Sequence, residues 1–202
     1  EGSGNVISGN RYGIWLLSDI ATGNIVHGNL IGTDPSGTGA LPNTEFGIHI
    51  SDEASGNTIG PDNIISGNRT NGIHITHQGT NGNHIIQNII GTNADNAAGI
   101  SNGGSGIAVV EGAADNVIGP DNVISSNAEA GISINNSNTT GNSIIGNLVG
   151  TTVDGMGALG NNTHGIHINA SNNIIGGTTQ EERNVISANG YFGLEIGSNI
   201  NV

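Results

Sequence analysis

Two histidines and their neighbours form the first pattern in the sequence that could do chemistry. His49 and His74 are each the middle residue of an Ile-His-Ile triplet, and Asp52 and His77 follow them at the same interval of three residues. Imidazole and carboxylate groups are ligands that Zn²⁺ and Cu²⁺ accept in proteins. If the two segments lie side by side, these four residues predict a small metal-binding grid on the surface.

An aromatic residue extends the same pattern. Trp15, the single tryptophan, occupies the position in Gly-Ile-Trp-Leu that His49 and His74 occupy in their triplets. A contiguous, outward-facing strip of one indole and two imidazoles predicts a surface that could hold the face of a sugar ring. The alternative is a half-exposed strand on which histidine is tolerated, because Ala108 and Ser133 stand at the same position in later segments.

Three loops of equal length carry aspartates that could supply oxygen ligands to calcium. The loops are GTDPSGTGALPN at 32–43, GTNADNAAGISN at 91–102 and GTTVDGMGALGN at 150–161. Their acids are Asp34, Asp95 and Asp154, and carboxylate oxygen is a ligand that Ca²⁺ prefers. However, Asp34 aligns with Asn93 and Thr152 rather than with the other two acids. Calcium binding and ordinary turn formation therefore both stay open for these loops.

An internal repeat would position all of these residues. NVISGN at 5–10 returns as NIISGN at 63–68, NVISSN at 122–127 and NVISAN at 184–189, and most other matching segments are 59 residues apart. Within each 59-residue unit the phrase Gly-Ile-x-Ile occurs twice, at alternating intervals of 34 and 25 residues. A period of this size is typical of stacked repeat architectures. The unit therefore predicts two coils of a solenoid.

Each predicted coil consists of three short strands joined by corners. The strand pieces alternate apolar and variable residues with period two, so Ile48 and Ile50 point inward and the residue between them points outward. Stacking predicts an all-β fold, a β-solenoid with three parallel sheets and about six full coils. Two columns of aligned asparagines mark corners, at which amides about 4.8 Å apart can form ladders. The columns are Asn24, Asn57, Asn83, Asn116, Asn142 and Asn173, and Asn5, Asn29, Asn63, Asn88, Asn122, Asn147 and Asn184.

These motifs carry a family resemblance. The pattern NVISGN…GI…GN.I.GN.IGTD…LPN…GI resembles the right-handed parallel β-helix repeat proteins, the pectin-lyase-like superfamily that includes NosD-like proteins. The resemblance covers residues 1–202 and implies one right-handed parallel β-helix domain, expected to be part of a longer repeat protein. It is specific for the fold and weak for activity, because the architecture hosts lyases, hydrolases, epimerases, adhesins and passive stalks.

The resemblance also tells which catalytic groups to look for. Lyases of this family use an arginine or lysine base beside calcium, and this chain has no lysine and only Arg11, Arg69 and Arg183. Arg11 and Arg69 lie in equivalent corners, and the hydrolase motifs NTD, DD, GHG and RIK are absent. We therefore expect a non-catalytic structural, adhesive or carbohydrate-binding solenoid. The alternatives are a polysaccharide lyase or C5-epimerase acting on an acidic glycan, and metal binding through surface histidines.

Composition limits the partners and the location. Three Lys and Arg residues against 16 Asp and Glu residues give a net charge of −13, which disfavours binding to nucleic acid and anionic membranes. No apolar run is long enough to span a bilayer. We expect a secreted or cell-surface protein with polysaccharide as a candidate partner. Because no capping segment is evident at either terminus, end-to-end association or stacking of further repeats is expected as well.

Overall fold

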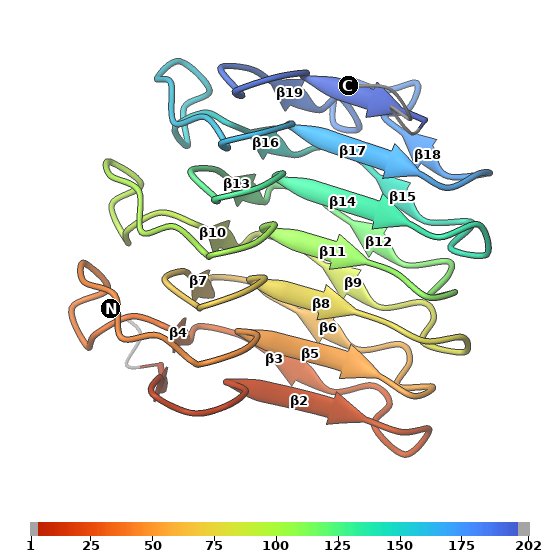
Figure 1. The fold of residues 1–202 in the computed structure, drawn as a ribbon, viewed down its shortest axis with the longest axis horizontal. Coiled ribbons are helices and arrows are strands. Elements are labelled where there is room, and N and C mark those ends of the chain that lie inside the picture. The colour runs from red at the N-terminus through yellow and green to blue at the C-terminus, as the bar shows by residue number, and fades with distance from the viewer. Residues whose placement is uncertain (1–3, 198–202) are drawn as a thin grey trace.

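The computed structural model describes residues 4–197 of the chain as a stack of parallel coils (Figure 1). All strand pairs in the three sheets are parallel, and the strands recur in the same order around each coil. The predicted three-sheet solenoid is therefore confirmed. Residues 1–3 and 198–202, which belong to the termini for which we expected no cap, lie outside the described part.

Each coil contributes one short strand of two to four residues to each sheet. Sheet 1 contains β1 (Val6–Ile7), β4 (Leu30–Ile31), β7 (Ile64–Ile65), β10 (Ile89–Ile90), β13 (Val123–Ile124), β16 (Leu148–Val149) and β19 (Val185–Ile186). Sheet 2 contains β2 (Ile14–Leu17), β5 (Ile48–Ser51), β8 (Ile73–Ile75), β11 (Ile107–Val109), β14 (Ile132–Asn135), β17 (Ile166–Asn169) and β20 (Leu194–Ile196). Sheet 3 contains β3 (Ile25–Val26), β6 (Thr58–Ile59), β9 (His84–Ile85), β12 (Val117–Ile118), β15 (Ser143–Ile144) and β18 (Ile174–Ile175).

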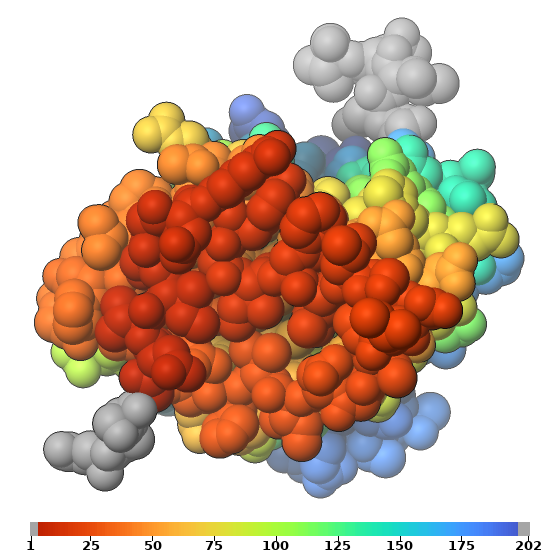
Figure 2. Space-filling view, turned by 90° about the horizontal axis from the view of Figure 1, so that it is seen from below, coloured from red at the N-terminus to blue at the C-terminus, as the bar shows by residue number. Residues whose placement is uncertain are grey.

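Aliphatic side chains fill the space between the three sheets. In sheet 2 the inward pair of each strand from β5 to β17, such as Ile73 and Ile75, is buried, and sheets 1 and 3 each contribute one residue per coil, such as Ile90 and Ile85. The β-branched side chains suit this narrow interior because they are stiff and pack well on pleated strands. The first coil is less well covered, and a hollow of about 300 Å³ there is lined by Ile7, Ile14, Ile25 and Val26, among others. Figure 2 shows this N-terminal end of the stack.

Asparagine ladders run along all three corners, one more than the sequence predicts. The two predicted columns form ladders with Nδ2···Oδ1 distances such as 3.0 Å from Asn88 to Asn122 and 3.0 Å from Asn57 to Asn83. The additional ladder lies between sheets 1 and 2, and its members are Asn10, Asn43, Asn68, Asn102, Asn127, Asn161 and Asn189. In every ladder the amide nitrogen donates to the asparagine of the following coil.

Glycine opens each strand of sheet 2, and from β2 to β17 the reason is that the following coil approaches closely there. A Cβ built on Gly106 would lie 2.6 Å from Ile124 Cγ2 and 2.7 Å from the carbonyl oxygen of Gly131. Gly72 and Gly131 have equivalent surroundings. The glycine of Gly-Ile-x-Ile is thus required by the spacing of the coils.

Candidate functional site

The outer face of sheet 2 carries the predicted strip in the predicted register. Trp15 of β2 pairs with His49 of β5, and His49 pairs with His74 of β8. The column continues through Ala108, Ser133, His167 and Glu195. The alignment of the coils is therefore confirmed, residue by residue.

The predicted exposure of this strip is wrong for His49. Its side chain is buried, with 9% of the residue exposed, whereas 45% of Trp15 is exposed. The cause is a second row of rings from the corner before sheet 2. Tyr12 lies 5.5 Å from His49, and Phe46 lies 5.0 Å from it, between ring centroids. The sequence prediction missed both residues, although each directly precedes the glycine that opens its strand.

Together five rings form a surface that we call the aromatic platform: Tyr12, Trp15, Phe46, His49 and His74. The Trp15 and His49 rings are stacked at 5.3 Å with an interplanar angle of 13°, and the Phe46 and His74 rings are stacked at 4.2 Å and 10°. Tyr12 contacts Trp15 of the strip at 5.1 Å and Phe46 of its own row at 5.9 Å, between ring centroids. These contacts between rings hold the side chains of the platform in place. Trp15, of which 45% is exposed, is the most exposed residue among the five.

The imidazoles of the platform are uncharged at neutral pH. Burial lowers the pKa of His74 from its ordinary value of 6.5 to about 4, and the neighbouring His49 lowers it further. Burial also lowers the pKa of His49. The amide Nδ2 of Asn71 donates to Nδ1 of His74 at 3.1 Å, which requires an unprotonated nitrogen there. Neither ring nitrogen of His49 has a hydrogen-bond partner among the described residues.

Charged groups at the edge of the platform are already paired. Nε of Arg11 donates to Glu45 at 2.7 Å, and the guanidinium lies 5.1 Å from the centre of the Tyr12 ring. On the other side Asp52 and His77 are joined as the sequence predicts, with 2.8 Å between Oδ1 and Nδ1. Glu111, which the sequence prediction did not single out, lies 3.1 Å from Nε2 of the same imidazole.

The predicted metal grid divides into two separate pairs. His77 is joined to Asp52, and His49 is joined to His74 by ring contact at 5.5 Å between centroids. Among residues 4–197, no three histidine, aspartate or glutamate side chains are arranged to hold a metal ion. Metal binding by these four residues stays a prediction, and no described ligand set supports it.

The aspartates of the long loops are not brought together either. Oδ1 of Asp34 accepts hydrogen bonds from the hydroxyl and the backbone amide of Ser36, and these lower its pKa. Asp154 accepts from Thr152 and Met156 in the same way within its own loop, whereas Asp95 is exposed. The loops contact each other through the backbone, from Ala94 N to Gly37 O at 3.0 Å. Calcium binding at these loops stays a prediction.

A second cluster of rings lies at the other end of sheet 2. His164 is 2.9 Å from Glu195 through Nε2, and His167 is 3.7 Å from the same carboxylate oxygen. Phe192 stacks on His164 at 5.6 Å, and Tyr191 contacts it edge-on at 5.8 Å. His164 and Phe192 occupy the position before the strand glycine, as Tyr12 and Phe46 do. The two clusters are separated by small side chains such as Ala108 and Ser133.

Comparison with known proteins yields a likeness of fold and none of sequence. No protein-family model matches the chain, and no curated protein matches it. Two solved structures of the periplasmic alginate epimerase AlgG resemble it, one described simply as AlgG with a TM-score of 0.64 at 19% identity and one of a point mutant with 0.66 at 17%. The matches cover 97% and 96% of this chain but only 40% and 41% of the AlgG chains, so it spans about two fifths of their length. Together with the three parallel sheets, this likeness shows that the chain has the fold of a right-handed parallel β-helix.

Proposed function

We propose that the chain is a non-catalytic, glycan-binding β-helix whose aromatic platform stacks on sugar rings. The observation that carries this proposal is the five-ring surface on the outer face of sheet 2, with Trp15 exposed at its edge. Aromatic side chains that stay partly exposed on a rigid scaffold typically mark binding surfaces. The apolar C–H face of a pyranose ring is a fitting partner for them, and adjacent coils offer successive rings about 4.8 Å apart.

The charges around the platform favour an uncharged glycan. The net charge of −13 opposes a polyanion, and Arg11 is engaged with Glu45. His49 and His74 add no positive charge at neutral pH, because burial lowers both pKa values. We therefore propose a neutral polysaccharide as the ligand class. A secreted or cell-surface location agrees with such a ligand, and the periplasmic location named for AlgG supports the broader proposal of a protein outside the cytoplasm. No helix in residues 4–197 is both long and apolar enough to cross a membrane.

Affinity measurements on a panel of soluble glycans test this function. We expect neutral oligosaccharides to bind the wild-type chain and Trp15→Ala to weaken binding at least about tenfold, as the loss of a ring contact of about 1.4 kcal/mol would. Tyr191→Ala is the matched control, because Tyr191 is an exposed aromatic residue outside the platform. Equal affinity of the wild-type chain and Trp15→Ala for every glycan would refute the proposal.

A second candidate is a lyase or C5-epimerase acting on an acidic glycan. The likeness to AlgG supports it at the level of the fold, and the partly buried His164–Glu195 pair is a group that could move a proton. Incubation of alginate in D₂O, with and without added calcium, tests this candidate. Both reactions remove the C5 proton, so deuterium at C5 or an unsaturated product would favour catalysis. Their absence in both conditions would reject it.

We also propose that further coils, from the same protein or from a second copy, stack on the ends of this β-helix. The inner aliphatic residues of the first coil are only partly covered, and the asparagine ladders have acceptor groups on one side and donor groups on the other. This polarity favours head-to-tail contact, in which the N-terminal end of one copy meets the C-terminal end of the next. Such a heterologous contact builds an open chain of copies and not a closed ring. Sedimentation velocity over a concentration series should show association of the 202-residue chain. A single monomeric species at all concentrations would contradict stacking of a second copy.

A further inference from the structure

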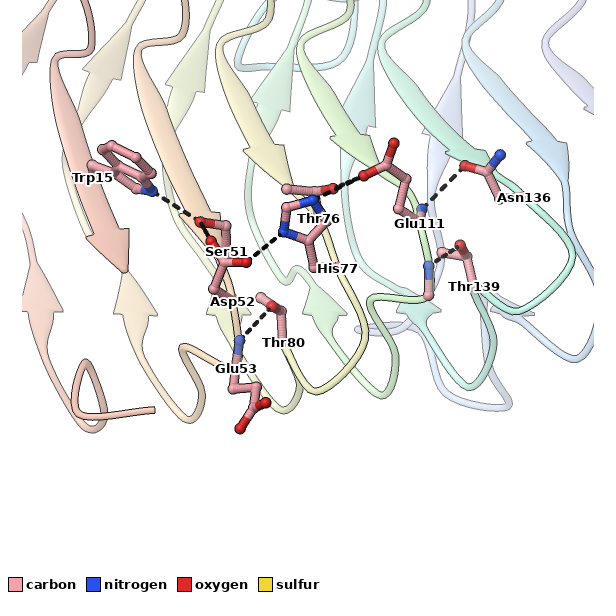
Figure 3. Close-up of polar contacts among 11 residues, drawn as sticks. Trp15, Ser51, Asp52, Glu53, Thr76, His77, Thr80, Glu111, Asn136 and Thr139 are labelled. Atoms are coloured by element: carbon pink, nitrogen blue, oxygen red, sulfur yellow. Dashed lines mark hydrogen bonds and ion pairs between the residues drawn. The ribbon is translucent and has the colours of Figure 1, made fainter. Parts of the chain in front are cut away.

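A chain of hydrogen bonds leads away from the exposed indole of the platform (Figure 3). Nε1–H of Trp15 donates to Oγ of Ser51 at 2.9 Å, and the hydroxyl of Ser51 donates to Oδ2 of Asp52 at 3.0 Å. The other carboxylate oxygen of Asp52 lies 2.8 Å from Nδ1 of His77 in the next coil. The path therefore joins the platform to an imidazole that makes no ring contact with it.

The far side of this imidazole is held as well. Nε2 of His77 lies 3.1 Å from Oε2 of Glu111, one coil further along. The same oxygen accepts a hydrogen bond from the hydroxyl of Thr76 at 2.9 Å, and the backbone amide of Glu111 donates to Oδ1 of Asn136 at 3.1 Å. His77 is thus fixed between carboxylates of the preceding and following coils.

The direction of the bonds is determined by the chemistry of Ser51. Its side chain has one proton, and its oxygen already accepts from the indole, so that proton goes to Asp52, which as a carboxylate only accepts. Ser51 is fully buried, so solvent does not compete for its hydroxyl group. The orientation of its hydroxyl therefore depends on where the carboxylate of Asp52 is held. Hydrogen bonds linked in this way strengthen one another.

Asp52 needs a partner to stay in that position. Its side chain is exposed in a tight corner, where the residue has a positive φ of 54°, and solvent competes for its oxygens. Of the two side chains that bond it, only His77 comes from another coil. The imidazole is exposed too, so it acts by geometry and not by filling the core.

We propose that His77 is a positioning residue for the aromatic platform. It holds Asp52, and through Ser51 it fixes the plane in which the indole of Trp15 is presented to a ligand. Only the effect on ligand affinity rests on the proposed glycan-binding function. The effect on the indole itself does not, and it can be measured without any ligand.

The fluorescence of the single tryptophan provides that measurement. Trp15 is the only tryptophan in the chain, so its time-resolved anisotropy and its quenching by acrylamide report on one indole. His77→Gln and Ser51→Ala should both increase the fast component of the anisotropy decay and the quenching constant. His84→Gln is the matched control, because His84 lies in the same coil, on the outer side of β9 in sheet 3. It should leave both quantities at the wild-type values.

A double variant separates a positioning role from general loosening of the fold. If His77 acts through Ser51, the Ser51→Ala/His77→Gln chain should show the same indole mobility as Ser51→Ala alone, since residues in one network are not additive. Additive effects would overturn the proposal, as would a His77→Gln signal equal to that of His84→Gln. Unfolding curves of all variants should confirm that the β-helix is retained.

Glycan affinity forms the second arm of the test. For a neutral oligosaccharide that binds the wild-type chain, His77→Gln should weaken binding about fivefold, as expected for the indirect loss of one hydrogen bond of about 1 kcal/mol. Unchanged affinity with a more mobile indole would overturn the role in binding. If no glycan binds the wild-type chain, the proposed function fails, and the fluorescence of His77→Gln still decides whether His77 positions Trp15.

Discussion

Oδ1 of Asn122 accepts two hydrogen bonds from Asn88 of the preceding coil, one from Nδ2 at 3.0 Å and one from the backbone amide at 3.1 Å. The side chain of Asn88 also donates to the carbonyl oxygens of Ile59 and Ile86, each at 2.9 Å. One amide thus ties together three consecutive coils at a corner that is shielded from solvent. The three ladders thus join neighbouring coils by hydrogen bonds at the corners, as the aliphatic side chains join them by packing in the interior.

Removing one amide from the middle of a ladder should be costly. Asn88 is 1% exposed, so Asn88→Ala leaves buried partners without hydrogen bonds and should lower the free energy of unfolding by about 3 kcal/mol. Asn5→Ala is the control, because Asn5 is exposed at the end of the same ladder and should cost less than about 1 kcal/mol. Urea unfolding followed by circular dichroism measures both. Equal losses would show that burial of the ladder does not contribute.

Acid should weaken the fold through the platform histidines. The pKa of His74 is about 4 in the folded state against 6.5 when the ring is free, so the folded state resists protonation. The stabilisation is complete above pH 6.5 and is lost as the pH falls from there through about 4. The difference between these values corresponds to at most about 3 kcal/mol. Unfolding curves between pH 7 and pH 4 should show the decline, and His74→Phe should reduce it.

The low pKa of His74 should depend on the ring that covers it. Phe46 stacks on His74 at 4.2 Å, so Phe46→Ala exposes the imidazole and should move its pKa upward, toward 6.5. Histidine titration by nuclear magnetic resonance measures the change directly. Tyr191→Ala, which removes an exposed ring from the other cluster, should leave the His74 titration where it is. A His74 pKa that stays near 4 in Phe46→Ala would show that the sheet, and not Phe46, provides the burial.

A matched pair of glycines separates close approach between coils from local chain flexibility. Gly106→Ala would place a Cβ 2.7 Å from the Gly131 carbonyl oxygen and should destabilise the fold by about 3 kcal/mol. Gly193 opens β20 in the same column, and among residues 4–197 the nearest neighbour of its Cβ would be Ile186 Cγ2 at 3.6 Å, an ordinary contact. Gly193→Ala should therefore be neutral or slightly stabilising. Thermal unfolding of the two variants compares them.

Much of the fold could be predicted because each coil repeats the same constraints. The period-two pattern in Ile-His-Ile determines which residues point inward, and the repeat length determines which residues become neighbours. The pairing of Trp15 with His49 and of Asp52 with His77 follows from alignment alone. The third ladder could have been found in the same way, but Asn43 follows a long loop while Asn68 lies only three residues after β7, which hides their equivalence.

The burial of the site could not be predicted in the same way. Tyr12 and Phe46 lie in corners, and a sequence pattern does not determine where a corner side chain points. Their rings turn onto the sheet and cover His49, because stacking on an imidazole removes apolar surface from water. The sequence does not single out Glu111, because its coil has Ala108 at the strip position and no histidine marks it.

The contacts between the long loops determine how this molecule can change in size. Ala94 of the second loop donates to Gly37 of the first, and Val153 of the third loop donates to Asn96 of the second, so each loop reaches across the short coil between them. Deleting one coil would bring two long loops into adjacent layers, where they would compete for the same space. Deleting or duplicating two coils would leave every junction unchanged. Gene segments that encode such a protein should therefore be gained and lost as 59-residue modules, with in-frame copies tolerated and half-modules eliminated.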